Sequence, residues 1–130
     1  MNGFVGNVEQ LSLVNDNFRE VLYTAHHSQL VLMSIEVGSE IGEEVHELDQ
    51  FIRIEKGQGK AVLDGVEHEL SDGSAIVVPA GMRHNVINTG SEPLKLYTIY
   101  CPPEHQDGVV RKTKADAESQ PEHFDGKTTE

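Results

Sequence analysis

Short apolar segments that recur along the chain are the feature that most constrains its fold. They are rich in Val, Ile, Leu and Tyr, recur about every 8–12 residues, and are separated by turn signals such as Asp64-Gly65. No helical pattern lies between them, and this spacing is typical of a β-sandwich or barrel. The expected strands cover Glu20–Thr24, Gln29–Val37, Phe51–Glu55, Lys60–Leu63, Ala75–Val78, His84–Asn88 and Leu94–Tyr100.

Composition excludes several classes of partner. The chain has 130 residues and a net charge of -12, which suits one domain and argues against binding to nucleic acid or to an anionic membrane surface. No apolar run approaches the roughly 20 residues that cross a bilayer. The N-terminal MNGFVGNVEQ lacks the basic and apolar regions of a signal peptide, so we expect a cytoplasmic protein. The single cysteine, Cys101, excludes an internal disulfide and a multi-cysteine zinc site.

Two segments are expected to point polar side chains into the barrel. Glu44 and His46 are two residues apart, so both project from the same face of an extended segment. Gln50 shares the parity of the isoleucines that follow it, and these should face the core. His84 stands at the start of a strand, directly after the sharp Pro79–Gly81 turn. If these two segments pack together, four donor groups converge.

With these segments placed, the chain resembles the cupin family, in particular the small single-domain members similar to mannose-6-phosphate isomerases. The stretch GSEIGEEVHELDQFIRIEKG, from Gly38 to Gly57, has every spacing of the first cupin motif, which reads Gly, five residues, His-x-His, three or four residues, Glu, six residues, Gly. The stretch GSAIVVPAGMRHNVIN, from Gly73 to Asn88, matches the second motif without departure. The resemblance covers roughly residues 30–100 and implies a single-domain, all-β jelly-roll barrel, also called a double-stranded β-helix.

The resemblance also implies a metal site at the barrel mouth. By position, its ligands are Glu44, His46, Gln50 and His84, with Glu44 in place of a family histidine and Gln50 in place of the family glutamate. The two changes keep one carboxylate, and two histidines with one carboxylate are a set that suits a divalent transition metal, namely Fe, Mn, Ni or Zn. The alternative is that metal binding has been lost and that Glu44 and Gln50 only form hydrogen bonds inside the barrel.

On this assignment the chain divides into three parts. Residues 1–28 form an N-terminal arm and the first strand, residues 29–103 form the barrel core, and residues 104–130 form a polar C-terminal tail. The tail has little apolar surface to bury, so we expect part of it to be mobile, with a short helix near residues 112–118. His105 follows the last barrel strand and is a candidate catalytic residue near the mouth; a purely structural role is the alternative.

Three functions from different classes are open. The first is a metal-dependent enzyme that shifts a proton beside a hydroxy-carbonyl group of a small sugar or sugar acid, as an isomerase does. The second is an Fe(II)-dependent dioxygenase at the same site. The third is a non-catalytic module that binds a small ligand or a metal. Phosphorylated sugars are disfavoured because the barrel region has few cations, namely Arg53, Lys56, Lys60, Arg83 and Lys95. The resemblance further implies a homodimer.

Overall fold

The computed structural model describes residues 1–130 and contains two antiparallel sheets with two short helices. The strands are β1 (Arg19–Thr24), β2 (Gln29–Ile35), β3 (Asp49–Lys56), β4 (Gly59–Leu63), β5 (Val66–Leu70), β6 (Ala75–Val78), β7 (His84–Asn88), β8 (Leu94–Cys101) and β9 (Val110–Arg111). The helices are α1 (Val8–Val14) and α2 (Lys114–Ser119). The expected all-β, single-domain jelly-roll fold is confirmed, and the expected strands agree with the observed ones within two residues at each end.

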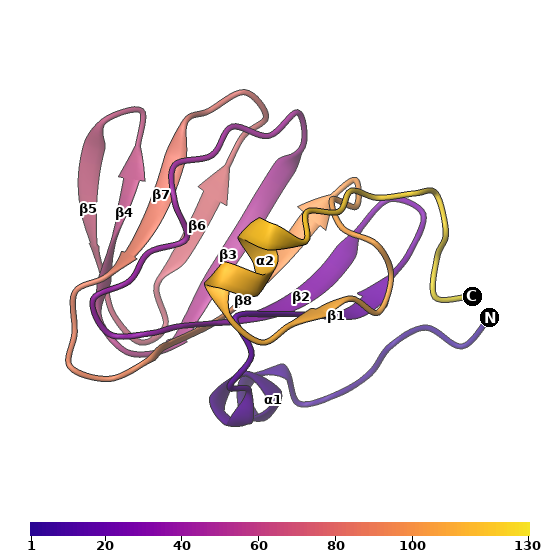
Figure 1. Cartoon of the computed structure of the whole chain (residues 1–130), viewed down its shortest axis with the longest axis horizontal. Coiled ribbons are helices and arrows are strands. Elements are labelled where there is room, and N and C mark those ends of the chain that lie inside the picture. The colour runs from indigo at the N-terminus through magenta and orange to yellow at the C-terminus, as the bar shows by residue number, and fades with distance from the viewer.

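The two sheets have the crossed strand order of a jelly roll. The larger sheet has the order β6-β3-β8-β2-β1-β9 and the smaller has the order β5-β4-β7 (Figure 1). The β4–β5 hairpin turns at Asp64-Gly65, where both residues have positive φ, as the Asp-Gly pair predicts. Every paired strand is antiparallel, so side chains of both sheets alternate between the interior and the solvent.

The core lies between the sheets, and its polar positions fall near the strand ends. In β3, Gln50 is buried on the same face as Ile52 and Ile54, which confirms the parity prediction. In β7, His84 is buried on the same face as Val86. The middle of the barrel is therefore apolar, while Gln50 and His84 extend its interior as polar groups.

The strand directions define two ends of the barrel. Gln50 lies opposite Tyr100 in the pairing of β3 with β8, and Glu44 forms a bridge with His84 at the start of β7. We call this end the mouth. The turns that follow β3, β5 and β7 form the opposite end, which we call the far end.

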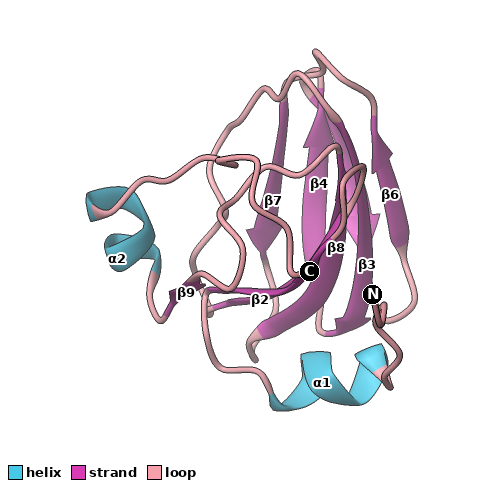
Figure 2. Ribbon diagram, turned by 90° about the vertical axis from the view of Figure 1, so that its right-hand side faces the viewer, coloured by secondary structure: helices cyan, strands magenta, loops and turns pink.

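The segments outside the barrel pack against it rather than extending from it. The helix α1, capped by the Asn7 side chain, packs against β2, β3 and β8, and α2 lies on another side of the molecule (Figure 2). Helix α1 was not expected from the sequence, because VEQLSLV is only seven residues long and shows no sustained helical period. Neither helix is long and apolar enough to cross a membrane.

The C-terminal tail returns to the barrel and ends beside the N-terminus. α2 begins at Lys114, within the range expected for a helix, and its N-cap is the Thr113 side chain. Beyond it, the Phe124 N–H donates to the Glu104 carbonyl at 2.8 Å, and the Thr129 N–H donates to the Thr24 carbonyl at 2.9 Å. Figure 1 shows the two termini next to each other. The tail therefore lies against the barrel and can contribute to its mouth.

Candidate metal centre at the barrel mouth

Backbone hydrogen bonds hold the two cupin motifs together at the mouth. The Glu44 N–H donates to the His84 carbonyl at 2.8 Å, and the His84 N–H donates to the Glu44 carbonyl at 2.9 Å. The Gly81 N–H donates to the His46 carbonyl at 2.8 Å, so the turn that contains Gly81 fixes the backbone of His46. Gly81 has φ +85°, a conformation that residues with a side chain rarely adopt. The Pro-x-Gly turn thus places both histidine-bearing segments side by side.

Three of the predicted ligand side chains meet. The His46 Nε2 lies 2.8 Å from Glu44 Oε2, and the rings of His46 and His84 have centroids 5.2 Å apart. The His84 Nδ1 lies 3.0 Å from the Met82 carbonyl, which can only accept, so Nδ1 carries the proton and donates. The Nε2 of His84 is then left with a free lone pair, which is the tautomer that a metal ligand needs.

Gln50, the fourth predicted ligand, is buried with one free oxygen. The Thr98 hydroxyl donates to the Phe51 carbonyl at 2.9 Å, so its oxygen must accept from Gln50 Nε2, also at 2.9 Å. This assigns the amide orientation and leaves Gln50 Oε1 as the free atom. Oε1 has no hydrogen-bond partner although it is buried. A buried carbonyl oxygen without a donor is costly, and a cation or a ligand donor would satisfy it.

The charge of His46 is set by its carboxylate neighbours. Burial lowers the pKa of His46, but the hydrogen bond and charge of Glu44 and the charge of Glu104 outweigh burial, so the pKa is raised above its ordinary value. A proton is thus favoured between His46 and Glu44. Because a metal ligand must be deprotonated, a metal at this pair would have to displace that proton.

The donor set fits a divalent metal, although the side chains do not surround a common point. No three His, Cys, Asp or Glu side chains stand in an arrangement that would hold a metal ion. The 2.8 Å between Glu44 and His46 is the distance of the hydrogen bond that joins them. The support for a metal comes from the chemistry of the donors, because two imidazoles and one carboxylate are a ligand set for divalent transition metals. Together with the free Gln50 oxygen and the free His84 nitrogen, the residues present suit the group that the motif implies.

A second chain of buried groups runs from the mouth into the C-terminal tail. The Tyr100 ring packs edge-on against both His46 and His105, with centroids 5.9 Å and 5.2 Å away. The His105 Nε2 lies 3.4 Å from the Tyr100 hydroxyl, and its Nδ1 lies 2.8 Å from Glu122 Oε1. The structure therefore places His105, the predicted catalytic candidate, next to the centre but separated from it by Tyr100.

Burial determines the protonation of this chain. It lowers the pKa of His105 to about 2, with the nearby Arg19 adding to the effect, so the ring is neutral. The His105 Nδ1–H donates to the Glu122 carboxylate, so Nε2 has the lone pair and accepts from the Tyr100 hydroxyl. Burial also raises the pKa of Tyr100, which keeps the phenol protonated. The result is a fixed donor sequence from Tyr100 through His105 to Glu122.

Two arginines accompany the buried Glu122 carboxylate. The side chain of Glu122 is 5% exposed, with Arg111 Nη2 at 3.2 Å and Arg19 Nη1 at 3.7 Å. Arg19 and Glu44 also line a cavity of 310 Å³ between the mouth and α2. Arg19 and Glu122 were not predicted near the site. They meet only because the C-terminal tail folds back onto β1, and no local sequence motif predicts that contact.

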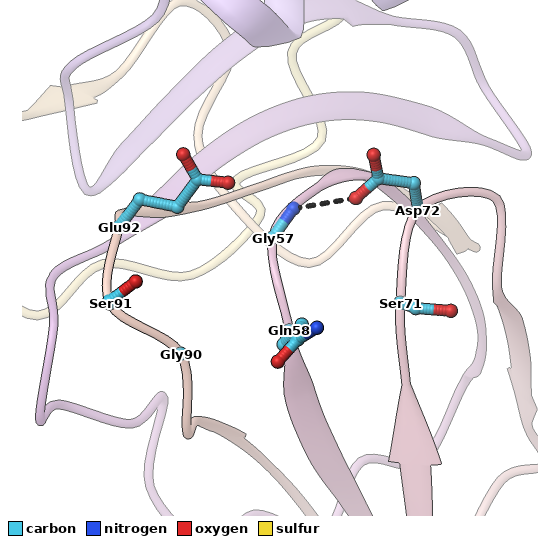
Figure 3. Close-up of a pocket in the computed structure, with 7 residues that line it drawn as sticks. All are labelled: Gly57, Gln58, Ser71, Asp72, Gly90, Ser91 and Glu92. Carbon is cyan, nitrogen blue, oxygen red and sulfur yellow. Dashed lines mark hydrogen bonds between the residues drawn. The ribbon is translucent and has the colours of Figure 1, made fainter.

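A larger hollow lies at the far end and has none of this chemistry. It measures 410 Å³ and is formed by turn residues after β3, β5 and β7, which Figure 3 shows. Within it, the Gly57 N–H donates to Asp72 Oδ1 at 2.8 Å. The hollow contains no histidine, and its residues are Gly57, Gln58, Ser71, Asp72, Gly90, Ser91 and Glu92.

Comparison with known proteins agrees with this geometry. The family model described as "Cupin domain" matches residues 31–100, so the chain belongs to the cupin family. Cupins generally hold a divalent metal and bind small molecules. The chain is 50% identical over 121 residues to YrkC, an uncharacterized protein of Bacillus subtilis (strain 168), in a match that covers 88% of this chain and 65% of that protein.

Solved structures confirm the fold. The crystal structure of the Bacillus halodurans protein BH2720 matches with a TM-score of 0.90 and 46% identity, and the match covers 92% of this chain and 96% of that one. An RmlC-like cupin with a double-stranded β-helix fold from Methanocaldococcus jannaschii matches with a TM-score of 0.61 and 20% identity over 66% of this chain and 80% of that one. The second likeness supports the fold alone.

Proposed function

We propose that this cupin binds one divalent transition metal through Glu44, His46, Gln50 and His84, and that it is an enzyme. Its substrate would be a small polar molecule such as a sugar or sugar acid, and its reaction a proton shift beside a hydroxy-carbonyl group. The observation that carries the proposal is the buried, unpartnered Gln50 oxygen at the end of the barrel where the His84 nitrogen is free. A site that had lost its metal and kept only hydrogen bonds would be expected to pair that oxygen.

The metal would supply the charge that this chemistry needs. When bound, a divalent ion can act as a Lewis acid and stabilise negative charge that develops on a substrate oxygen. The carboxylate of Glu44 offsets part of the ion's charge, while the neutral Gln50 amide adds a weak oxygen donor. Two histidines with one carboxylate leave positions open for a substrate with two oxygens.

Tyr100 and His105 are the proposed groups for orienting a substrate at the mouth. The Tyr100 phenol stays protonated and lies against the His46 ring, and because its one proton is donated to His105, its oxygen can accept a hydrogen bond from a substrate hydroxyl. His105 is neutral, and its Nε2 accepts from the Tyr100 hydroxyl, so it fixes the direction of that phenol. Glu122 keeps the Nδ1 proton in place and thereby preserves the accepting nitrogen.

Deuterium exchange tests the reaction class. Protein loaded with Mn²⁺ would be incubated in D₂O with unphosphorylated aldoses, ketoses and hexuronates, and proton NMR would follow the hydrogen next to the carbonyl group. We expect exchange with the wild type in the absence of O₂, no exchange with His84→Ala, and normal exchange with the exposed control His68→Ala. Equal exchange in His84→Ala would contradict the proposal, and turnover that requires O₂ would favour the dioxygenase.

The family resemblance also supports a homodimer, which stays a proposal. Strand β5 is a sheet edge whose first four residues are exposed, and such an edge is a natural surface for pairing. Sedimentation velocity at micromolar concentration would give the mass of a dimer; the mass of a monomer would contradict it.

A further inference from the structure

We propose that Arg19 recognises the substrate, by binding a carboxylate at the end of the molecule away from the reacting carbonyl. The substrate class is then a small sugar acid rather than a neutral or phosphorylated sugar. The inference rests on the proposed function for the reacting end, and it concerns a separate group of the chain.

The guanidinium of Arg19 is buried with two weak partners, the Phe18 ring, whose centroid lies 5.5 Å from Arg19 Cζ, and the Glu122 carboxylate. Its side chain is 12% exposed, and its Nε is buried with no hydrogen-bond partner. The carboxylate beside it, that of Glu122, lies 3.7 Å from Arg19 Nη1, which is beyond hydrogen-bond distance. Both oxygens of that carboxylate also have closer partners, in His105 at 2.8 Å and Arg111 at 3.2 Å.

Such an arrangement is costly unless something else completes it. A guanidinium has five N–H donors, and leaving a charged donor buried and unpaired costs more than leaving a neutral one. Its planar fork matches the two oxygens of a carboxylate and can bind them side by side. Arg19 is therefore short of the partner that a carboxylate ligand would provide.

The cavity beside Arg19 reaches from this cation to one of the candidate metal ligands, Glu44. It measures 310 Å³, near the lower end of the roughly 300–1,000 Å³ of small-molecule sites. Arg19 and Glu44 both line it, so a small molecule inside could contact the arginine with one end and reach the Glu44 side of the candidate metal centre with the other. Phe18 and Ile41, which also line it, supply apolar surface for the body of the ligand.

Charge favours a carboxylate over a phosphate. Glu43, Glu44 and Glu118 line the same cavity as Arg19, and their repulsion would act more strongly on a dianion than on a monoanion. The other cation there, Lys114, already has its Nζ 4.0 Å from Glu118. A phosphate site would be expected to contain several free cations, whereas the single guanidinium of Arg19 matches the two oxygens of one carboxylate.

Three sugars that differ at one carbon test the proposal. Isothermal titration would measure the binding of D-glucuronate, D-glucose and D-glucose 6-phosphate to the protein, both loaded with Mn²⁺ and without metal. We expect the wild type to bind glucuronate about tenfold or more tighter than glucose, as a charge-assisted pair at a buried arginine predicts. Arg19→Met should reduce this preference to about twofold or less, and Arg19→Lys should keep part of it because a lysine retains the charge without the fork.

Arg53 provides the matched control. Its Nε is also buried and unpartnered, but its side chain is 41% exposed and does not line the mouth cavity. Arg53→Met should leave the preference for glucuronate unchanged, and melting temperatures would establish that each variant is folded.

The outcomes separate this inference from the proposed function. If the protein holds no metal but still prefers glucuronate through Arg19, the inference stands and the metal proposal fails. If metal is bound but glucuronate has no advantage over glucose, or does not bind, the inference is overturned and the metal proposal stands. Tighter binding of glucose 6-phosphate than of glucuronate would also overturn it.

Discussion

The two ends of the barrel differ in chemistry more than in shape. The far-end hollow is the larger, at 410 Å³ against 310 Å³ for the cavity between the mouth and α2, yet only turn residues form it. The mouth gathers the buried groups Gln50, His84, Tyr100 and His105. Cavity size alone would therefore select the wrong end, whereas the buried polar groups identify the end at which chemistry is possible.

The ends also differ in how well their polar atoms are paired. At the far end, Asn88 donates to two carbonyls, those of Ile35 at 3.0 Å and Glu92 at 2.9 Å, and accepts from the Gly90 N–H at 2.9 Å. At the mouth, Gln50 Oε1 and Arg19 Nε have no partner. Toward the far end, Arg53 Nε also lacks a partner, but that side chain is 41% exposed and lies near Gly73. An unpaired atom in a side chain as buried as Gln50 is expected where a ligand completes the site.

Removal of the tail's buried carboxylate should have the largest effect on stability. Glu122→Ala leaves Arg19, Arg111 and His105 without their shared partner, and breaking a buried ion pair from one side costs about 3–5 kcal/mol. Urea denaturation would measure the loss. Glu118→Ala, whose side chain is 70% exposed, should change the free energy of unfolding by less than about 0.5 kcal/mol. Equal effects of the two substitutions would show that the tail does not support the mouth.

A packing defect near the far end should lower stability and spare the mouth. A Cβ at Gly59 would lie 2.5 Å from the Ile87 carbonyl oxygen, so Gly59→Ala forces the backbones of β4 and β7 apart. We expect a loss of about 2–3 kcal/mol in urea denaturation, with metal content unchanged. At Gly90 the nearest atoms to a new Cβ are 3.4 Å away, so Gly90→Ala is the control and should be nearly neutral. If folded Gly59→Ala lost its metal, the two ends of the barrel would not be independent, which would contradict this prediction.

The neutral state of His105 predicts a specific response to acid. Because its pKa is about 2 in the folded protein and near 6.5 when unfolded, the unfolded chain binds the extra proton below pH 6.5. Stability should therefore fall as the pH is lowered, by about 2 kcal/mol from this group at pH 5.

The contribution of His105 can be isolated from that of other acid-sensitive groups. The difference in unfolding free energy between pH 7 and pH 5 should be about 2 kcal/mol smaller in His105→Gln than in the wild type. The same difference should be unchanged in His123→Gln, because that side chain is 86% exposed. Identical pH dependence in His105→Gln and the wild type would show that His105 is not held neutral.

Local patterns made part of this site predictable from the sequence. The spacings from Gly38 to Gly57 and from Gly73 to Asn88 predicted the fold, since the first motif leads from a loop into β3 and the second joins β6 to β7 through a turn. Alternation then placed Gln50 and His84 inside the barrel. These inferences depended on residues that are near one another in the chain, where backbone periodicity is informative.

Arg19 and Glu122 could not be predicted in the same way. Arg19 lies on β1, and its carboxylate neighbour Glu122 comes from the tail, so only the folded chain brings them together. The polar composition of the tail suggested mobility, but composition does not show that one of its carboxylates is buried between two arginines and a histidine. For the same reason, the cations considered from the sequence were only those of the barrel region, and Arg19 and Arg111, which lie outside it, were not among them.

Metal content tests the central claim most directly. Wild type, His84→Ala and His68→Ala would be purified without added metal, incubated with Mn²⁺, Fe²⁺, Ni²⁺ or Zn²⁺, dialysed and analysed by plasma mass spectrometry. The account predicts about one metal ion per chain in the wild type and in His68→Ala, and little or none in His84→Ala. A wild type that holds no metal under any of these conditions, or a His84→Ala variant that holds as much as the wild type, would contradict it.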